Sequence, residues 1–225
     1  MFMTRTPLKD RKLPDYTRGE DIANMVTHII GGAIGIVTLV FAVIISALHS
    51  NVWGIVGGAV YGASMIALYS VSSVYHGLRP GMGKKVMQVI DHCTIYFLIA
   101  GTYTPILLSS IRPTHPALAW AIFGIEWGLV AFAVVFTAID HRKYAVLSMI
   151  CYIGMGWCII FAMSATVECM GRDGFAWLVA GGLAYTIGAV LYVIGRKKPI
   201  MHTIFHLFVD VGSLLQAICI LFYVL

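Results

Sequence analysis

Long apolar segments separated by short polar breaks fill the chain from residue 22 to its end. Each segment is close to the ~20 residues that an α-helix needs to cross a bilayer. We expect seven transmembrane helices, at Ile22–Leu48, Trp53–Leu78, Val86–Ser110, Ala117–Ile139, Ala145–Val167, Phe175–Gly195 and Met201–Leu225. Composition agrees, because 60% of the 225 residues are hydrophobic and 11% are charged, whereas a soluble domain carries about 25% charged residues. We therefore expect an integral membrane protein.

The polar breaks between these segments hold only a few residues each. Short connections make consecutive helices antiparallel. The sequence thus predicts an all-α membrane protein with one domain, a seven-transmembrane helix bundle over residues 22–225. Residues 1–21 form a polar, proline-containing arm that we expect to be loosely ordered at the membrane surface. No second domain and no secretory signal peptide are expected.

Lysine and arginine are concentrated on one side of the expected bundle. Thirteen of them lie in the N-terminal arm and in three loops, which hold Arg79, Lys84 and Lys85, then Arg142 and Lys143, then Arg196, Lys197 and Lys198. Arg112 and Arg172 fall on the other side. Because positive charge marks cytoplasmic loops, we expect a cytoplasmic N-terminus, an external C-terminus and a place in the cell's inner (plasma) membrane.

Charge and cysteine content exclude other classes of protein. The net charge of +5 comes without a basic stripe interleaved with aromatic residues, so no nucleic-acid partner is expected. The five cysteines are scattered, form no CxxC pair and are odd in number, which argues against a disulfide framework.

Glycines recur at the spacing of small residues that lets membrane helices approach closely. These are Gly31 with Gly35, Gly54 with Gly58 and Gly62, and Gly124 with Gly128. We expect all three groups to lie at helix contacts.

Polar residues share one face of the last apolar segment. His202, His206 and Asp210 are spaced i, i+4, i+8, so a helix places them on one side. Polar groups inside an apolar helix must face something polar within the protein. Two imidazoles one turn apart can bind one metal ion, although a pair of hydrogen-bonded core histidines would have the same spacing.

Topology brings two more residues to the same depth. His76 ends the second expected helix and Asp91 opens the third, both at the end of the bundle where His202 and His206 begin the last helix. Three histidines with an open fourth position are typical of a catalytic zinc site. We therefore predict that His76, His202 and His206 bind Zn²⁺ and that Asp91 holds or deprotonates a water beside the metal.

Other polar residues lie near this predicted site. Asp21 and Asn24 either cap the first helix or hold the loops around the site, and His28 lines the site or makes structural hydrogen bonds. Ser72 shares a helix face with His76 and either bonds near the metal or bonds its own backbone. Asp210 is a candidate partner behind the ligands, and Glu126, in mid-helix, has no assigned role.

The segments EDIANMVTH, SVSSVYH, DHCTIYFLIAGTYTP and HTIFHLFVDVGS resemble the hemolysin III family, the bacterial branch of the progestin and adipoQ receptor (PAQR) superfamily. The resemblance covers essentially the whole chain. The family's Ser-x3-His, Asp and His-x3-His pattern matches Ser72, His76, Asp91, His202 and His206. In the adiponectin receptors of this superfamily the three histidines bind zinc and the Asp contacts a zinc-bound water. The resemblance implies a zinc site here, with hydrolytic action on lipid amides similar to that of ceramidases.

Two positions depart from the family's pattern. Many relatives have a further histidine where this chain has Gln216, and Asp210 stands where an apolar residue is expected. The three-histidine set is intact, but a role for a fourth histidine is not expected here.

Three hypotheses for function follow. The leading one is a zinc-dependent lipid amide hydrolase, with a membrane lipid as its substrate and a role in membrane lipid homeostasis. The second is a non-enzymatic, receptor-like regulator of membrane homeostasis in which zinc only ties helices together. The third, a pore-forming cytolysin, is disfavoured because the chain has no secretion signal and no amphipathic segment awaiting insertion. The sequence does not indicate an oligomeric state.

Overall fold

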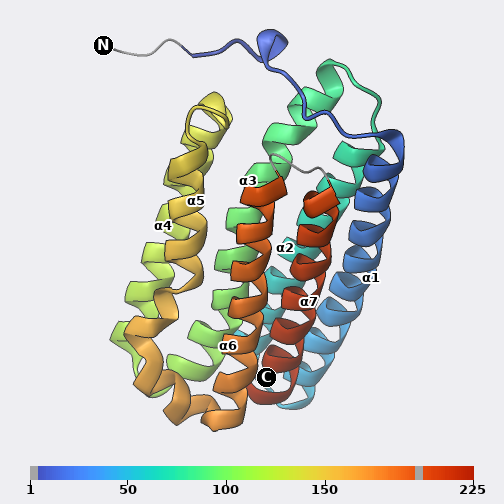
Figure 1. The fold of residues 1–225 in the computed structure, drawn as a ribbon. Coiled ribbons are helices and arrows are strands. Elements are labelled where there is room, and N and C mark those ends of the chain that lie inside the picture. The colour runs from blue at the N-terminus through green and yellow to red at the C-terminus, as the bar shows by residue number, and fades with distance from the viewer. Residues whose placement is uncertain (1–4, 196–199) are drawn as a thin grey trace.

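The computed structural model describes residues 5–195 and 200–225, and these residues form helices and turns with no strand (Figure 1). The main helices are α1 (Arg18–Leu48), α2 (Val52–Gly77), α3 (Met82–Pro105), α4 (Pro116–Asp140), α5 (Ala145–Gly156), α6 (Met163–Gly195) and α7 (Ile200–Tyr223). Short turns of helix lie at Leu8–Asp10, Ile106–Ile111 and Cys158–Ala162. The main helices alternate in direction, so the N-terminal arm and the C-terminus lie at opposite ends of the bundle.

The described residues contain six helical stretches long and apolar enough to cross a membrane. One of them, Ala145–Ile194, holds 50 residues and covers the two segments expected at 145–167 and 175–195. The prediction of one continuous helix from Ala145 to Val167 is wrong, because α5 ends at Gly156 and a 3₁₀ turn follows it. The chain bends again at Gly171, whose φ of 73° favours glycine. In Figure 1 the two halves of this stretch run in opposite directions.

The first helix begins earlier than hydropathy predicts, at Arg18 rather than Ile22. Thr17 is its N-cap: the Thr17 hydroxyl accepts from the Glu20 N–H, and the Glu20 carboxylate accepts from the Thr17 N–H. This capping box satisfies backbone donors at the helix start. Residues 18–21 therefore belong to α1, which fixes Asp21 on a rigid element.

The α1–α2 contact depends on small residues. A Cβ added at Gly62 would lie 2.5 Å from Leu39 Cβ and 2.7 Å from Leu39 Cα, and one at Gly58 would lie 2.7 Å from Ala42 Cβ. A Cβ would also meet neighbours at 2.3 Å at Gly31, 2.7 Å at Gly54 and 3.0 Å at Gly35, so the predicted role of these glycines in packing is confirmed. The prediction for Gly124 and Gly128 is wrong within this chain, because a Cβ at either would meet no described atom within 4 Å.

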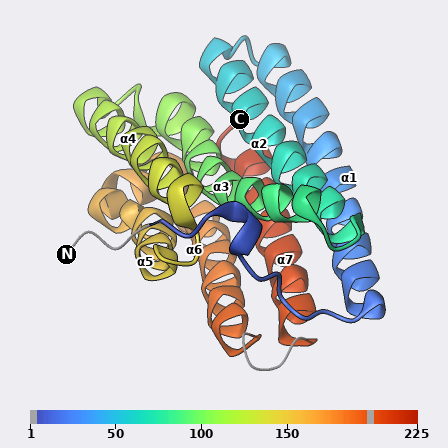
Figure 2. The same cartoon turned by 90° about the horizontal axis from the view of Figure 1, so that it is seen from above.

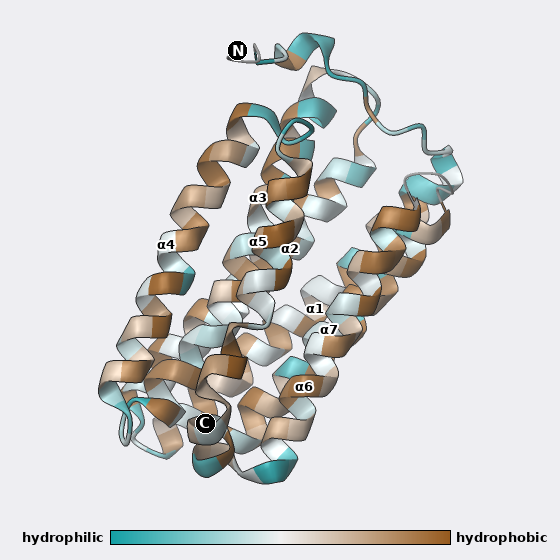
Figure 3. Cartoon of the chain, turned by 60° about the vertical axis from the view of Figure 1, so that its left-hand side comes forward, coloured by the Kyte–Doolittle hydropathy of each residue, from teal (hydrophilic) through white to brown (hydrophobic). Residues whose placement is uncertain are grey.

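Hydrophobic residues run along the lengths of the helices, and most of the strongly hydrophilic ones lie near the two ends of the bundle (Figure 3). Large exposed hydrophobic residues lie along every main helix, as a surface that faces lipid requires. Buried polar side chains, among them His76, Glu126 and Gln216, face the interior.

The N-terminal arm crosses one end of the bundle, as Figure 2 shows. Its Arg11 is only 3% exposed. The Arg11 guanidinium donates to the Ile139 carbonyl at 2.5 Å and lies 3.3 Å from His141 Nδ1, while the Thr6 N–H donates to Asp140 Oδ2 at 3.0 Å. The expectation of a loosely ordered arm is therefore wrong for these residues, because a buried guanidinium with backbone and imidazole partners anchors them.

Gly62→Ala should destabilise the bundle by about 1–3 kcal/mol, because the new methyl group meets Leu39 backbone that cannot move aside. Gly128→Ala is the matched control and should stay within about 1 kcal/mol of wild type, since its methyl enters open space and alanine favours helix. Detergent-induced unfolding in mixed micelles, followed by circular dichroism, measures both. Equal stability of the two variants would contradict this account of the α1–α2 contact.

Docking of the arm should weaken as the pH falls below ~6.5. Burial, His92 and Arg11 lower the pKa of His141 to about 3; Arg142 acts in the same sense and Asp140 opposes it. Undocked His141 would take up a proton near its ordinary pKa, so acid favours the undocked arm. Limited proteolysis of the arm at pH ~7 and pH ~5 should show faster cleavage in acid, and His141→Gln should remove most of that difference.

Candidate metal centre

Two helices, α2 and α7, bring the predicted histidine ligands together. His76 ends α2, and His202 and His206 occupy successive turns at the start of α7. One nitrogen from each ring lies within 4.8 Å of the others, and the His202 and His206 Nε2 atoms are 3.1 Å apart. All three side chains are buried, with at most 8% of each residue exposed. This cluster can bind a metal ion.

Asp21 fixes the orientation of His76. Asp21 Oδ1 lies 3.0 Å from His76 Nδ1, and Lys84 Nζ donates to Asp21 Oδ2 at 2.5 Å. An imidazole that donates from Nδ1 to a carboxylate has its Nε2 lone pair free for a metal. His76 Nε2 is buried and has no hydrogen-bond partner within the described chain, as expected of a ligand atom that faces the centre of the cluster.

The backbone of α1 fixes His206 in a similar way. His206 Nδ1 lies 3.3 Å from the Asn24 carbonyl and 3.4 Å from Thr27 Oγ1. Asn24 Oδ1 accepts from the Thr203 hydroxyl at 2.7 Å, which ties α1 to α7. With Nδ1 donating to the carbonyl, the Nε2 lone pair of His206 points toward His202 Nε2.

The donor set fits a divalent metal. Three imidazoles that present nitrogen lone pairs to one point suit zinc, which binds histidine at about 2.0–2.1 Å. Without a cation or a shared proton, two Nε2 lone pairs 3.1 Å apart would repel each other. Three neutral donors admit other divalent ions as well.

Asp91 and Ser72 line the same cavity as His202 and His206. Asp91 lies in the third turn of α3, with its Oδ2 4.0 Å from His92 Nδ1. Ser72 Oγ is buried and has no hydrogen-bond partner in the part of the chain that the structure describes. The structure thus places both residues beside the histidines, where their predicted roles can be tested.

His28 and Asp210 lie deeper than the ligands. The His28 ring stacks on His206, with centroids 3.7 Å apart and an angle of 8° between the planes. Its two ring nitrogens make no hydrogen bond to a described residue. The Asp210 carboxylate occupies the space over Gly31, where a Cβ would lie 2.6 Å from Oδ1. His28 supports the His206 ring directly, whereas Asp210 is a turn away.

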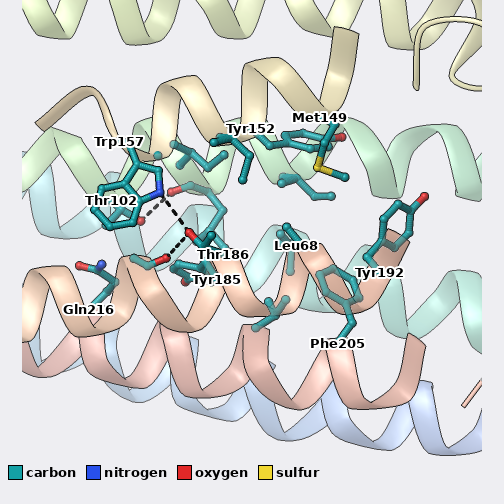
Figure 4. Close-up of a pocket in the computed structure, with 18 of the residues that line it drawn as sticks. Leu68, Thr102, Met149, Tyr152, Trp157, Tyr185, Thr186, Tyr192, Phe205 and Gln216 are labelled. Atoms are coloured by element: carbon teal, nitrogen blue, oxygen red, sulfur yellow. Dashed lines mark hydrogen bonds between the residues drawn. The ribbon is translucent and has the colours of Figure 1, made fainter. Parts of the chain in front are cut away.

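An apolar cavity of about 170 Å³ extends from the histidines toward the middle of the bundle. Figure 4 shows Tyr192 and Phe205 at one end and Gln216 at the other. Tyr192 and Phe205 flank His202, with ring centroids 5.8 and 5.5 Å from it. The Trp157 indole donates to Thr186 Oγ1 at 3.0 Å in the cavity wall. Residues of α2, α3, α5, α6 and α7 line this space, so it lies inside the bundle, with α5 and α6 both in its wall.

Glu126 lies away from the histidine cluster. Its side chain is fully buried in α4, and neither carboxylate oxygen has a hydrogen-bond partner among the described residues. It does not line the cavity. The geometry gives it no part in the metal centre.

Sequence reasoning missed two residues at the site. Lys84, counted only as a cytoplasmic charge, is 3% exposed and holds Asp21. Tyr16, in the arm, stacks on His202 with ring centroids 5.1 Å apart. An aromatic residue close to the start of the first expected helix was the available signal for Tyr16, and Lys84 had none.

Comparison with known proteins places these residues in a wider group. Residues 16–217 match the family described as haemolysin-III related. The chain is similar to Hemolysin-3 of Bacillus cereus, with 39% identity over 206 residues and 92% of each chain covered. It is similar to the Hemolysin-3 homolog of Bacillus subtilis (strain 168), with 38% identity over 208 residues, covering 92% of this chain and 96% of that one. It also resembles the human monocyte to macrophage differentiation factor, with 29% identity over 218 residues, 93% of this chain and 85% of that one.

Asp21→Ala should weaken zinc binding about 10- to 100-fold, because His76 loses the carboxylate that fixes its tautomer and ring orientation. Asp15→Ala is the matched control: it removes the same charge from an exposed position in the arm and should leave affinity unchanged. Competition for zinc with a chelating dye measures both variants. Wild-type affinity in Asp21→Ala would show that His76 needs no orienting partner.

Proposed function

Because the chain belongs to the haemolysin-III-related family, we propose that it is an integral membrane zinc protein that hydrolyses the amide bond of a membrane lipid. The observation that carries the proposal is the orphaned Nε2 of buried His76, which faces two further imidazoles at one end of an apolar cavity. Burying such a polar cluster in an apolar bundle costs folding free energy, so its presence there points to a functional site.

The proposed topology has seven membrane crossings. The 50-residue stretch Ala145–Ile194 would be about 75 Å long at ~1.5 Å per residue, more than twice the ~30 Å hydrocarbon core. Its bend at Gly171 supports two crossings rather than one. The lysine and arginine distribution favours a cytoplasmic N-terminus and an external C-terminus in the inner membrane of a bacterium, although Arg196, Lys197 and Lys198 lie outside the described residues.

His76, His202 and His206 would hold the zinc. When bound, zinc supplies a Lewis acid that makes water a nucleophile near neutral pH and polarises the substrate carbonyl. Asp91 would orient the attacking water and take its proton, then pass that proton to the leaving amine. Ser72, which lines the same cavity as Asp91, would donate to the substrate carbonyl oxygen. Asp21 and Asn24 would keep the ligand rings oriented.

The substrate class follows from the cavity. Its wall is formed largely by aliphatic and aromatic side chains of α3, α5, α6 and α7, which suits an acyl chain rather than a sugar or a nucleotide. A lipid amide would place its carbonyl near Asp91 and its acyl chain toward Gln216. Because α5 and α6 both line the cavity and pack little on each other, the lipid would enter from the bilayer between these two helices.

A second candidate is a receptor-like regulator in which zinc is structural. The observation that favours it is mechanical, because the Asp21–His76–Lys84 contacts already join α1, α2 and α3 and zinc would add α7. A relative named for monocyte to macrophage differentiation carries no enzymatic term in its name. A cytolysin, which the name Hemolysin-3 of another relative suggests, is disfavoured because nothing in the described bundle resembles a segment held ready for insertion.

Metal analysis of the detergent-purified protein tests the proposal. Wild type should hold about one zinc per chain, and the His202→Ala, His206→Ala double variant should hold none. Asp91→Ala should keep its zinc and lose hydrolysis of ceramides and other N-acyl lipids by at least ~100-fold. If Asp91→Ala keeps both its zinc and the full cellular phenotype, the structural role is favoured. If the wild-type protein holds no metal, both the hydrolase and the structural-zinc proposals are wrong.

A further inference from the structure

The N-terminal arm crosses one end of the bundle (Figure 2), and its Tyr16 packs on the histidine cluster there. The Tyr16 ring lies nearly parallel to His202, with centroids 5.1 Å apart and an angle of 22° between the planes. It also lies 5.8 Å from the His76 ring. Tyr16 thus contacts two ligands that come from different helices.

Several contacts hold the arm in this position. Arg11 binds the Ile139 carbonyl and His141 at the α4–α5 turn. The Lys85 ammonium donates to the Lys9 carbonyl, and the Arg142 guanidinium donates to the Lys12 carbonyl. On the other side of Tyr16, the Thr17 capping box continues the chain into α1. The arm is therefore fixed at both ends, with Tyr16 between them.

We infer that Tyr16 is a positioning residue of the metal centre, and that the anchored arm closes the end of the cluster that faces water. The inference rests on the proposed zinc site. The flat phenol ring restricts rotation of the His202 imidazole, which has Phe205 and Tyr192 near its other sides. A ligand ring held between aromatic faces stays oriented without a hydrogen bond of its own.

With the arm in place, the histidine cluster has the arm on one side and the apolar cavity on the other. The cavity that α5 and α6 help to line is largely apolar and disfavours a hydrated ion, whereas the side under Tyr16 lies at the polar end of the bundle (Figure 3). Zinc would enter or leave when the arm lifts. Arg11, which anchors the arm at the α4–α5 turn, would set how often that occurs.

The rate of zinc loss tests this in protein reconstituted in lipid nanodiscs with excess EDTA. Tyr16→Ala should release zinc about tenfold faster than wild type, as removal of a group that orients a ligand does, and Tyr16→Phe should restore the wild-type rate because the ring remains. Arg11→Met should also speed release. Lys12→Ala, at an exposed position with its backbone carbonyl intact, is the control and should match wild type.

A thiol reporter tests closure independently of metal. In a cysteine-free background, Ser72→Cys should react slowly with a charged, membrane-impermeant thiol reagent, and adding Tyr16→Ala should raise that rate about tenfold. Unchanged zinc release and unchanged labelling in Tyr16→Ala would overturn the inference, as would Tyr16→Phe behaving like Tyr16→Ala. Wild type without zinc would overturn the proposed function, and the labelling would still decide whether the arm closes the cluster.

Discussion

The hydrogen bond between Asp21 and His76 organises one end of this protein. A carboxylate buried at the start of α1 would be costly alone, and two partners from two other helices compensate it: His76 from α2 and Lys84 from α3. The same bond aims His76 Nε2 at His202 and His206 on α7. The orientation of His76 and the polar contacts that join α1, α2 and α3 at this end therefore share one carboxylate.

Close packing of α1 on α2 makes that bond possible. Gly35, Gly58 and Gly62 let the helix backbones approach along their whole length, and this approach brings the ends of the two helices within hydrogen-bonding distance. The capping box at Thr17 then adds the turn of helix that carries Asp21. Small residues in the middle of α1 and α2 thus support the polar cluster at the end of these helices.

Much of this arrangement could be predicted from the sequence. The lengths of the apolar segments predicted most helix positions, and the i, i+4 spacing placed His202 and His206 on one face. Because consecutive helices alternate in direction, His76 and Asp91 were expected at the same end of the bundle. The resemblance to the hemolysin III family is confirmed. Contacts that depend on chain bends could not be predicted. The break at Gly171, the burial of Lys84 and the stacking of Tyr16 on His202 depend on tertiary packing that hydropathy and periodicity do not encode.

The bundle is not equally tight around the histidines. On one side α1, α2 and α7 pack closely and supply the groups that hold the rings, His28 and Asn24 among them. On the other side α5 packs on α3 and α4, and a cavity separates it from α6. Rigid support behind the histidines and apolar space before them suit the proposed action on a lipid, because the histidine geometry would stay fixed while an acyl chain enters and leaves. A purely structural metal would need only the first half of this arrangement.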